Sequence, residues 1–95
     1  MTSKQRAILK GAAMKIQPIF QIGKGSLTPE ITTAIAEALE ARELIKINVL
    51  KNCLDDTNVI AQMLAERTHS TLVQVIGKKI VLYKPAADPK GRKYE

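Results

Sequence analysis

The chain has 95 residues, of which 45% are hydrophobic, 15 are Lys or Arg and 9 are Asp or Glu. This length supplies one hydrophobic core and excludes a protein of two domains. The formal net charge of +6 favours partners with a negative field, such as nucleic acid or an anionic membrane. No apolar run approaches the ~20 residues of a membrane span, and the N-terminus has no hydrophobic signal-peptide core. We therefore expect a cytoplasmic protein.

Three scarce residue types restrict the chemistry of the chain. Cys53 is the single cysteine and His69 the single histidine, which excludes an internal disulfide and argues against a zinc site. The aromatic residues are Phe20, Tyr83 and Tyr94, too few to recognise several bases by stacking. We expect no metal and no cofactor, and we expect any contact with RNA to be mostly with its backbone.

Helices are predicted from apolar residues that recur at helical spacing and from capping residues before them. Ser3 and Thr28 are expected N-caps, and Pro29 stands at the first helical position after Thr28. Asp55 and Asp56 offer a cap and carboxylates that suit the positive end of a helix dipole. These signals predict helices over residues 3–14, 29–41 and 57–67.

Strands are predicted from alternation with period two, which is clearest over residues 44–49, and from a hairpin turn at Gly77-Lys78. The order of elements is then α-β-α-β-α-β-β. It predicts a small α/β domain around a mixed four-stranded sheet whose last two strands are antiparallel, with the order of strands left open. We expect one domain over residues 1–84 and a mobile basic tail over residues 85–95. The predicted strands cover residues 19–22, 44–49, 70–76 and 79–83.

A glycine-rich basic loop joins the first strand to the second helix. Gly23 and Gly25 let backbone N–H groups approach a phosphate, and Lys24 adds a positive charge at the tip. The helix that follows is expected to contribute unpaired first-turn N–H groups and the positive end of its dipole. We interpret the loop as a device that binds the nucleic-acid backbone. The alternative is an ordinary turn in which the glycines only make the corner.

Other readings of the glycines and of the reactive side chains are weaker. The loop lacks Walker A spacing because Gly25 follows Lys24, and it lacks a dinucleotide fingerprint because Thr28 occupies the third glycine position. His69 has no carboxylate placed to orient it, and Cys53 has no partner base. The sequence therefore predicts that the protein is not an enzyme.

Lysine and arginine recur along the predicted elements and could form an extended binding surface. Scattered lysines are also common on an ordinary solvated surface, and this alternative stays open. The candidate residues outside the loop are Lys4, Arg6, Lys10, Lys15, Lys46, Lys78 and Lys79.

Three separated segments of the chain resemble a known family. They are Pro18-Ile19-Phe20-Gln21-Ile22-Gly23-Lys24-Gly25, Ala41-Arg42-Glu43-Leu44-Ile45-Lys46-Ile47 and Leu72-Val73-Gln74-Val75-Ile76-Gly77, and the opening Lys4-Gln5-Arg6 fits as well. They are similar to the bacterial YhbY-type proteins, members of the CRM (chloroplast RNA splicing and ribosome maturation) family, over about residues 3 to 84. The resemblance implies an RNA-binding domain similar to the C-terminal domain of translation initiation factor 3, associated with precursors of the large ribosomal subunit.

The resemblance also implies a G-x-x-G loop, comparable to the loop with which KH domains hold the nucleic-acid backbone. Its positions fall on Gly23, Lys24, Gly25 and Ser26, where Ser26 replaces the usual second glycine. We expect Gly25 to supply a positive φ in its place, and the Ser26 hydroxyl to donate to a phosphate or to help cap the helix. The leading hypothesis is a monomeric RNA-binding protein of ribosome assembly. The alternative is a phospho-ligand or protein-interaction module that uses the same loop.

Overall fold

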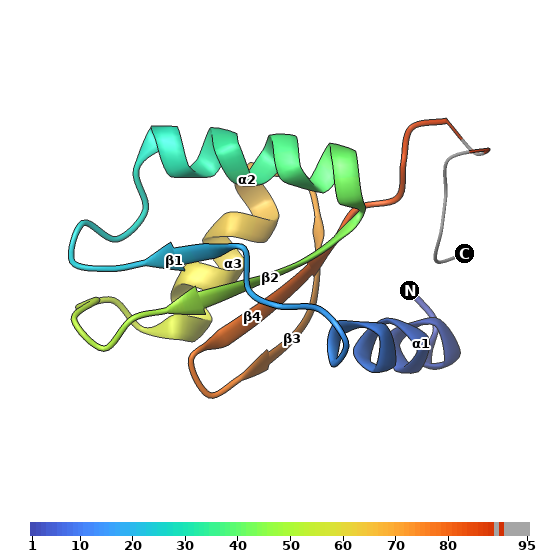
Figure 1. Ribbon diagram of the computed structural model, residues 1–95, viewed down its shortest axis with the longest axis horizontal. Coiled ribbons are helices and arrows are strands. Elements are labelled where there is room, and N and C mark those ends of the chain that lie inside the picture. Colours follow the sequence, from blue (N-terminus) through green and yellow to red (C-terminus); the bar gives the residue numbers. More distant parts are fainter. Residues whose placement is uncertain (89, 91–95) are drawn as a thin grey trace.

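A computed structural model describes residues 1–88 and residue 90, and it has three layers with the sheet in the middle (Figure 1). The predicted α/β fold with three helices and a four-stranded sheet is confirmed for the part of the chain that is described. The elements are α1 (Ser3–Ala13), β1 (Phe20–Ile22), α2 (Pro29–Arg42), β2 (Leu44–Val49), α3 (Thr57–Arg67), β3 (Thr71–Ile76) and β4 (Lys79–Tyr83).

Capping side chains fix where each helix begins. Thr28 Oγ1 accepts from the Ile31 amide at 3.2 Å, and Asp56 Oδ2 accepts from the amides of two residues in the first turn of α3, as expected of caps. The cap of α1 was predicted one residue too late. Thr2 rather than Ser3 is the N-cap, because its Oγ1 accepts from the Gln5 amide at 3.1 Å and Ser3 is already helical.

The strands lie in the order β1-β2-β4-β3. β1 and β2 are parallel, and β4 is antiparallel to both β2 and β3, so the predicted antiparallel last pair is confirmed. The chain crosses from β1 to β2 through α2 and from β2 to β3 through α3, each time in the same direction along the sheet. Both helices pack on one face of the sheet, which requires the two crossovers to have the same hand.

Two hydrophobic clusters occupy the two faces of the sheet. The larger cluster packs α2 and α3 against residues that alternate along the central strands, among them Ile45, Ile47 and Ile80. The smaller cluster packs Leu9 and Ala13 of α1 against the opposite face. Because α1 is short, it covers only one end of that face, as Figure 1 shows. The smaller cluster also contains Leu44, Val73, Val81 and Tyr83.

A β-bulge in β3 holds α1 in place. Leu72 pairs with Leu82 and Gln74 with Val81, which leaves Val73 as the extra residue of the bulged strand. Arg6 Nη1 of α1 donates to the carbonyls of both Leu72, at 3.2 Å, and Val73. The guanidinium therefore bonds carbonyls at an irregular point of the ladder and fixes the first turns of α1 against β3.

The chain leaves β4 along the end of α2. The Lys84 amide donates to the carbonyl of the buried Glu43 at 2.8 Å, and the Ala86 amide donates to Glu43 Oε2 at 3.4 Å. The predicted mobile tail falls partly on residues 89 and 91–95, which lie outside the described residues, and it stays a prediction. Within the described residues, no helix is long and apolar enough to cross a membrane.

Candidate nucleic-acid interface

The loop after β1 closes as a tight turn. The Ser26 amide donates to the Gly23 carbonyl at 2.9 Å, which closes a four-residue turn over Gly23 to Ser26. Ser26 has φ 51°, whereas neither Gly23 nor Gly25 has a positive φ. The expectation that Gly25 supplies the left-handed conformation is therefore wrong. The positive φ thus falls on Ser26, the last residue of the turn. This is the second glycine position of the G-x-x-G pattern, where a glycine would adopt a positive φ without backbone strain.

The Ser26 side chain is bonded to the neighbouring loop. Its hydroxyl donates to Asp55 Oδ2, and Thr28 rather than Ser26 caps α2, so the expected capping role of Ser26 is wrong, while its expected donation to a phosphate stays a prediction. The bond ties the β1–α2 loop to the β2–α3 loop across 29 residues of sequence. It also places a carboxylate on the α3 side of the loop, and a phosphate would therefore approach from the side away from α3.

The two glycines of the loop have different surroundings. A Cβ on Gly23 would lie 3.3 Å from Asn52 Oδ1 and 3.4 Å from Leu50 Cδ1, so the missing side chain lets the two loops pack together. A Cβ on Gly25 would meet no heavy atom within 4 Å, and its φ is ordinary. Packing accounts for Gly23, whereas no contact with the described residues requires a glycine at position 25.

The N-terminus of α2 has fewer free backbone N–H groups for an anion than predicted. Pro29 has no N–H, and the Ile31 amide is bonded to the Thr28 side chain. Glu30 adds a negative charge to the first turn. The helix thus offers fewer unpaired N–H groups to an anion than expected, because among its first three residues only the Glu30 amide has no acceptor in the described part of the chain. An anion at this end would therefore depend mainly on the loop.

The loop shares its edge of the sheet with two other turns. The Leu50 amide donates to the Ile22 carbonyl at 2.8 Å, and the Val49 amide donates to the Lys78 carbonyl at 2.7 Å. The ends of β1 and β2 and the β3–β4 turn therefore lie side by side, as Figure 1 also shows. This edge, which we call the loop edge, carries the exposed residues Lys24, Lys51 and Lys78.

The predicted basic residues do not form one cluster. Lys4, Lys10 and Lys15 are exposed on and just after α1, at the opposite end of the molecule from Lys24 (Figure 1). Arg6 is half-buried and one of its nitrogens is bonded to the bulge in β3. The candidates are thus spread along the longest axis, which extends 38 Å.

Lys46 and Lys79 connect these two groups. In β2 the residues that alternate with Lys46 face α2 and α3, which places Lys46 on the opposite face, the one that carries α1. The same argument places Lys79 there, because its neighbour Ile80 belongs to the larger cluster. Lys79 is exposed and Lys46 is half-buried.

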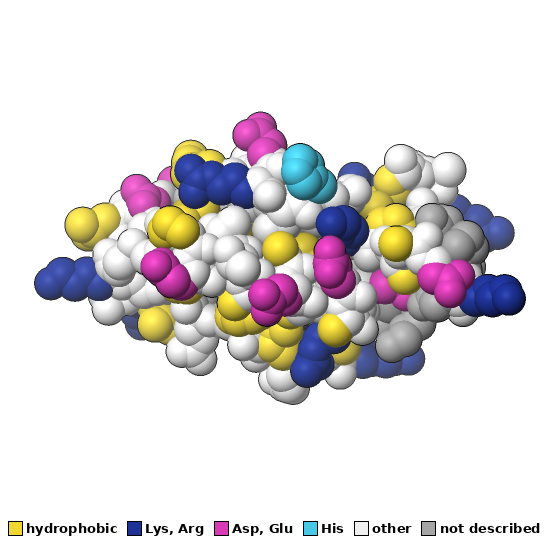
Figure 2. All heavy atoms as spheres, turned by 90° about the horizontal axis from the view of Figure 1, so that it is seen from above, with side chains coloured by type: hydrophobic (Ala, Val, Ile, Leu, Met, Phe, Trp, Pro, Cys, Tyr) yellow, Lys and Arg dark blue, Asp and Glu magenta, His cyan; other side chains and the backbone are white. Residues whose placement is uncertain are grey.

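The charges are separated between the two faces of the molecule. No Asp or Glu lies in α1 or in any of the four strands, all of which the structure describes in full. The face of α2 and α3 instead carries most of the acidic residues. Figure 2, which looks onto the side of α2, shows a row of carboxylates along the middle of this face, with some basic side chains between and around them and others standing out at both ends. The exposed acidic residues of α2, α3 and the loop before α3 are Glu30, Glu37, Glu40, Asp55, Asp56 and Glu66.

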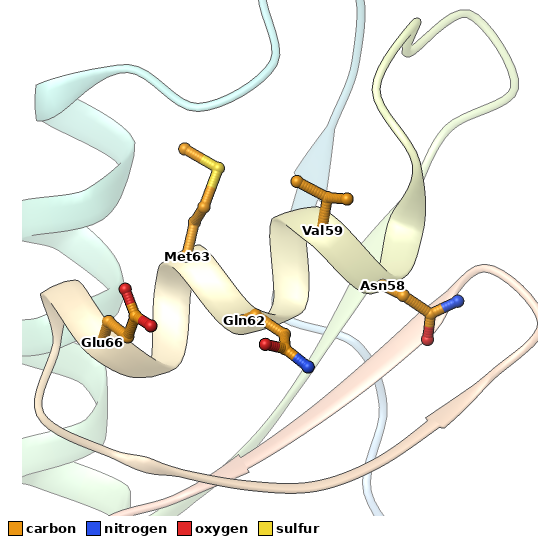
Figure 3. Close-up of a pocket in the computed structure, with 5 residues that line it drawn as sticks. All are labelled: Asn58, Val59, Gln62, Met63 and Glu66. Atoms are coloured by element: carbon orange, nitrogen blue, oxygen red, sulfur yellow. The ribbon is translucent and has the colours of Figure 1, made fainter.

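The described residues do not assemble catalytic groups. His69 is exposed and has φ 54° in the turn after α3, and Cys53 is buried, with its Sγ 3.8 Å from the Asp55 carbonyl. No group of three or more metal-ligating side chains occurs in the part of the chain that is described. A shallow pocket of about 250 Å³ on the outer face of α3 is lined by side chains of that helix alone (Figure 3). Its lining residues are Asn58, Val59, Gln62, Met63 and Glu66.

Comparison with known proteins shows the family of the chain. A family model for the CRS1 / YhbY (CRM) domain matches residues 1–84. The chain belongs to this family. It is 49% identical over 90 residues to a Bacillus subtilis protein named probable RNA-binding protein YqeI, with 95% of this chain and 94% of that one covered. It is 32% identical to a Haemophilus influenzae protein named RNA-binding protein, with 95% and 91% covered.

A solved structure has the same fold as this chain. The solution structure of the hypothetical protein SAV1595 from Staphylococcus aureus superposes with a TM-score of 0.80 and 44% identity, covering all of this chain and 99% of the other. The family identified from the three sequence segments is thus confirmed. The implied likeness to translation initiation factor 3 stays a prediction.

Two features of the CRM loop region were missed from the sequence. Of the pair Asp55 and Asp56, offered together as the cap of α3, Asp56 is the cap, and the bond that Asp55 accepts from Ser26 was not foreseen. Lys51 was not among the candidate residues, yet it is exposed on the loop edge, as Lys24 is. A sequence shows adjacency only along the chain, and both features depend on two loops meeting at the end of a parallel strand pair.

Proposed function

We propose that the protein binds RNA through its phosphate backbone, in association with precursors of the large ribosomal subunit. The observation that carries the proposal is the separation of charge, because a face with many cations and no carboxylate in its elements is suited to a polyanion. The names of the relatives support RNA as the polyanion. The ribosomal precursor is supported by the resemblance to YhbY-type proteins.

The loop is proposed to hold one phosphate at the end of this face. Ser26 uses its own amide to close the turn, and the amides of Lys24 and Gly25 donate to no acceptor among the described residues. The Lys24 ammonium supplies the charge, and the lack of a Cβ at Gly25 leaves room for a phosphate oxygen to reach the backbone. We propose a monomer that acts in the cytoplasm without catalysing a reaction.

The decisive experiment measures RNA affinity as a function of salt. We expect log affinity to fall linearly with log salt concentration, because binding releases counterions from each neutralised phosphate. Lys24→Ala should weaken binding to all RNAs alike and reduce the slope by about 1. Crosslinking in cells, followed by identification of the bound RNA, tests the ribosomal precursor. An affinity that does not respond to salt would contradict the mechanism.

The same loop could instead hold a mononucleotide or an acidic peptide. The observation that favours this second candidate is that the loop edge, with Lys24 and Gly25, lies away from the cations of α1 (Figure 1). Titration with ATP and GTP separates the two, since the loop lacks Walker spacing and we expect no tight binding of either. Specific, tight binding of one mononucleotide would favour the second candidate.

A further inference from the structure

One half of a sheet face is open to solvent in this fold. Leu44 and Tyr83 are buried on the face that carries α1, but the strands extend beyond the helix toward the loop edge (Figure 1). The register shows which residues lie there, since Gln21 is paired with Asn48 and Asn48 with Lys79. Lys79 is in turn paired with Ile76 of β3. A single row of side chains thus crosses all four strands.

The open half-sheet is mostly polar, unlike the rest of the sheet, although its row ends on the exposed Ile76 of β3. Gln21 is exposed and Asn48 is half-buried, and both alternate with residues of the larger cluster, so their side chains lie on the open face. In the next row, Lys46 and Gln74 both pair with Val81, which belongs to the α1 cluster. We call this surface the amide row; it consists of Gln21, Asn48, Gln74, Lys46 and Lys79.

The amide row lies between two groups of cations. The loop edge with Lys24, Lys51 and Lys78 flanks one side, and α1 with Lys10 and Lys15 flanks the other. Four strands span about 15 Å at ~4.8 Å per neighbour. This is the length of the amide row across the strands, and the two groups of cations flank the row along the strand direction. A polar strip with positive charge on both of these sides and no acidic residue in its strands is suited to a groove bordered by two phosphate backbones.

We infer that the amide row binds the minor groove of double-helical RNA. This inference rests on the RNA-binding function proposed above. The minor groove of A-form RNA is wide and shallow and presents 2′-hydroxyl groups, each a donor and an acceptor. A carboxamide also has both a donor and an acceptor, and Gln21, Asn48 and Gln74 supply three. The flanking cations contact the phosphates of the two strands, and the Gly23–Ser26 loop holds one of them.

Single-stranded RNA is a poorer match for this surface. Recognition of unpaired bases depends on stacking, and no aromatic side chain is exposed in the residues that the structure describes. Phe20 packs against the cluster on the opposite face, and Tyr83 is buried beneath α1. The surface is suited to sugars and phosphates rather than to splayed bases.

The first test compares three ligands of one mixed sequence by fluorescence anisotropy at fixed salt: an RNA duplex of about 16 base pairs, one of its strands alone, and the DNA duplex. We expect the RNA duplex to bind about tenfold more tightly than either of the others. Single-stranded RNA that binds as tightly as the duplex would overturn the inference and leave the proposed function standing. Failure of all three to bind would instead remove the proposed function.

The second test replaces the amides. Gln21→Ala combined with Asn48→Ala should reduce the preference for the RNA duplex over the DNA duplex severalfold without changing the salt slope, because neither side chain is charged. Gln62→Ala on the outer face of α3 is the matched control and should leave the preference unchanged. An unchanged preference in the double variant, with an unchanged melting curve, would show that the amides do not read the 2′-hydroxyls.

Discussion

Ser26 combines a strained backbone with a compensating side-chain bond. It is one of three non-glycine residues with a positive φ in the described chain, and a left-handed conformation costs such a residue about 1–2 kcal/mol. Its hydroxyl donates to Asp55, which holds the two loops together and offsets part of that cost. The serine therefore keeps a glycine-like backbone at this position through a bond that glycine could not make.

Replacing Ser26 with either glycine or alanine separates these two effects. Both variants lose the bond to Asp55, but only Ser26→Gly removes the Cβ from the left-handed position. Ser26→Ala should therefore be less stable than Ser26→Gly by about 1 kcal/mol in denaturant unfolding. We expect Ser26→Gly to leave RNA affinity unchanged or slightly higher. Equal stability of the two variants would show that the backbone at position 26 carries no strain.

The two loop glycines allow a matched comparison of packing and ligand contact. Gly25→Ala should keep the thermal transition of the wild type, because its Cβ points into open space at an ordinary φ. It should weaken RNA binding about tenfold if a phosphate reaches the amides there. Gly23→Ala should instead lower stability slightly, since Asn52 and Leu50 must move by a few tenths of an ångström.

Melting curves and RNA titrations on the same preparations check this pair. The contrary result is a folded Gly25→Ala protein with wild-type affinity. In that case the loop is only a turn, and the binding surface must lie on α1 and the open half-sheet.

At the scale of elements, sequence patterns within a few residues predicted where individual helices and strands begin and end. Period-two alternation gave β2 its observed bounds, and the acidic pair before α3 marked where that helix begins. The role of Arg6 could not be predicted in this way. Its acceptors in β3 are 66 and 67 residues away, and the bulge that exposes them is visible only once β3 pairs with β4. A residue that looked like an RNA contact also serves as a link between elements.

This link predicts different effects for two basic residues of α1. Arg6→Ala should lower the free energy of unfolding by about 1–3 kcal/mol, because it leaves carbonyls of the bulge without their donor. Lys10→Ala removes the same charge from an exposed position of the same helix and should change stability by less than about 0.5 kcal/mol. Urea unfolding of both variants measures the difference. Equal stabilities would mean that the Arg6 bonds contribute nothing net.

At the scale of the whole molecule, the sequence contained the charges but not their distribution. A net charge of +6 indicated an anionic partner, yet the separation into two faces depends on the strand order and on α2 and α3 sharing one face. The strand order could not be derived, because helical crossovers allow β4 to pair on either side of β3. For the same reason Gln21, Asn48 and Lys79 could not be recognised as neighbours before the sheet was known.

The separation of charge predicts that the location of a basic side chain affects RNA affinity more than the net charge of the protein does. Lys79→Ala and Arg67→Ala each remove one positive charge from an exposed side chain, the first on the open half-sheet and the second in the last turn of α3. Lys79→Ala should weaken binding to an RNA duplex severalfold and lower the magnitude of the salt slope by about 1, since it removes one phosphate contact. Arg67→Ala should leave both quantities unchanged. If the two variants lose affinity equally, binding responds to the overall charge of the molecule, and the face formed by α1 and the open half-sheet is no more involved than the face of α2 and α3.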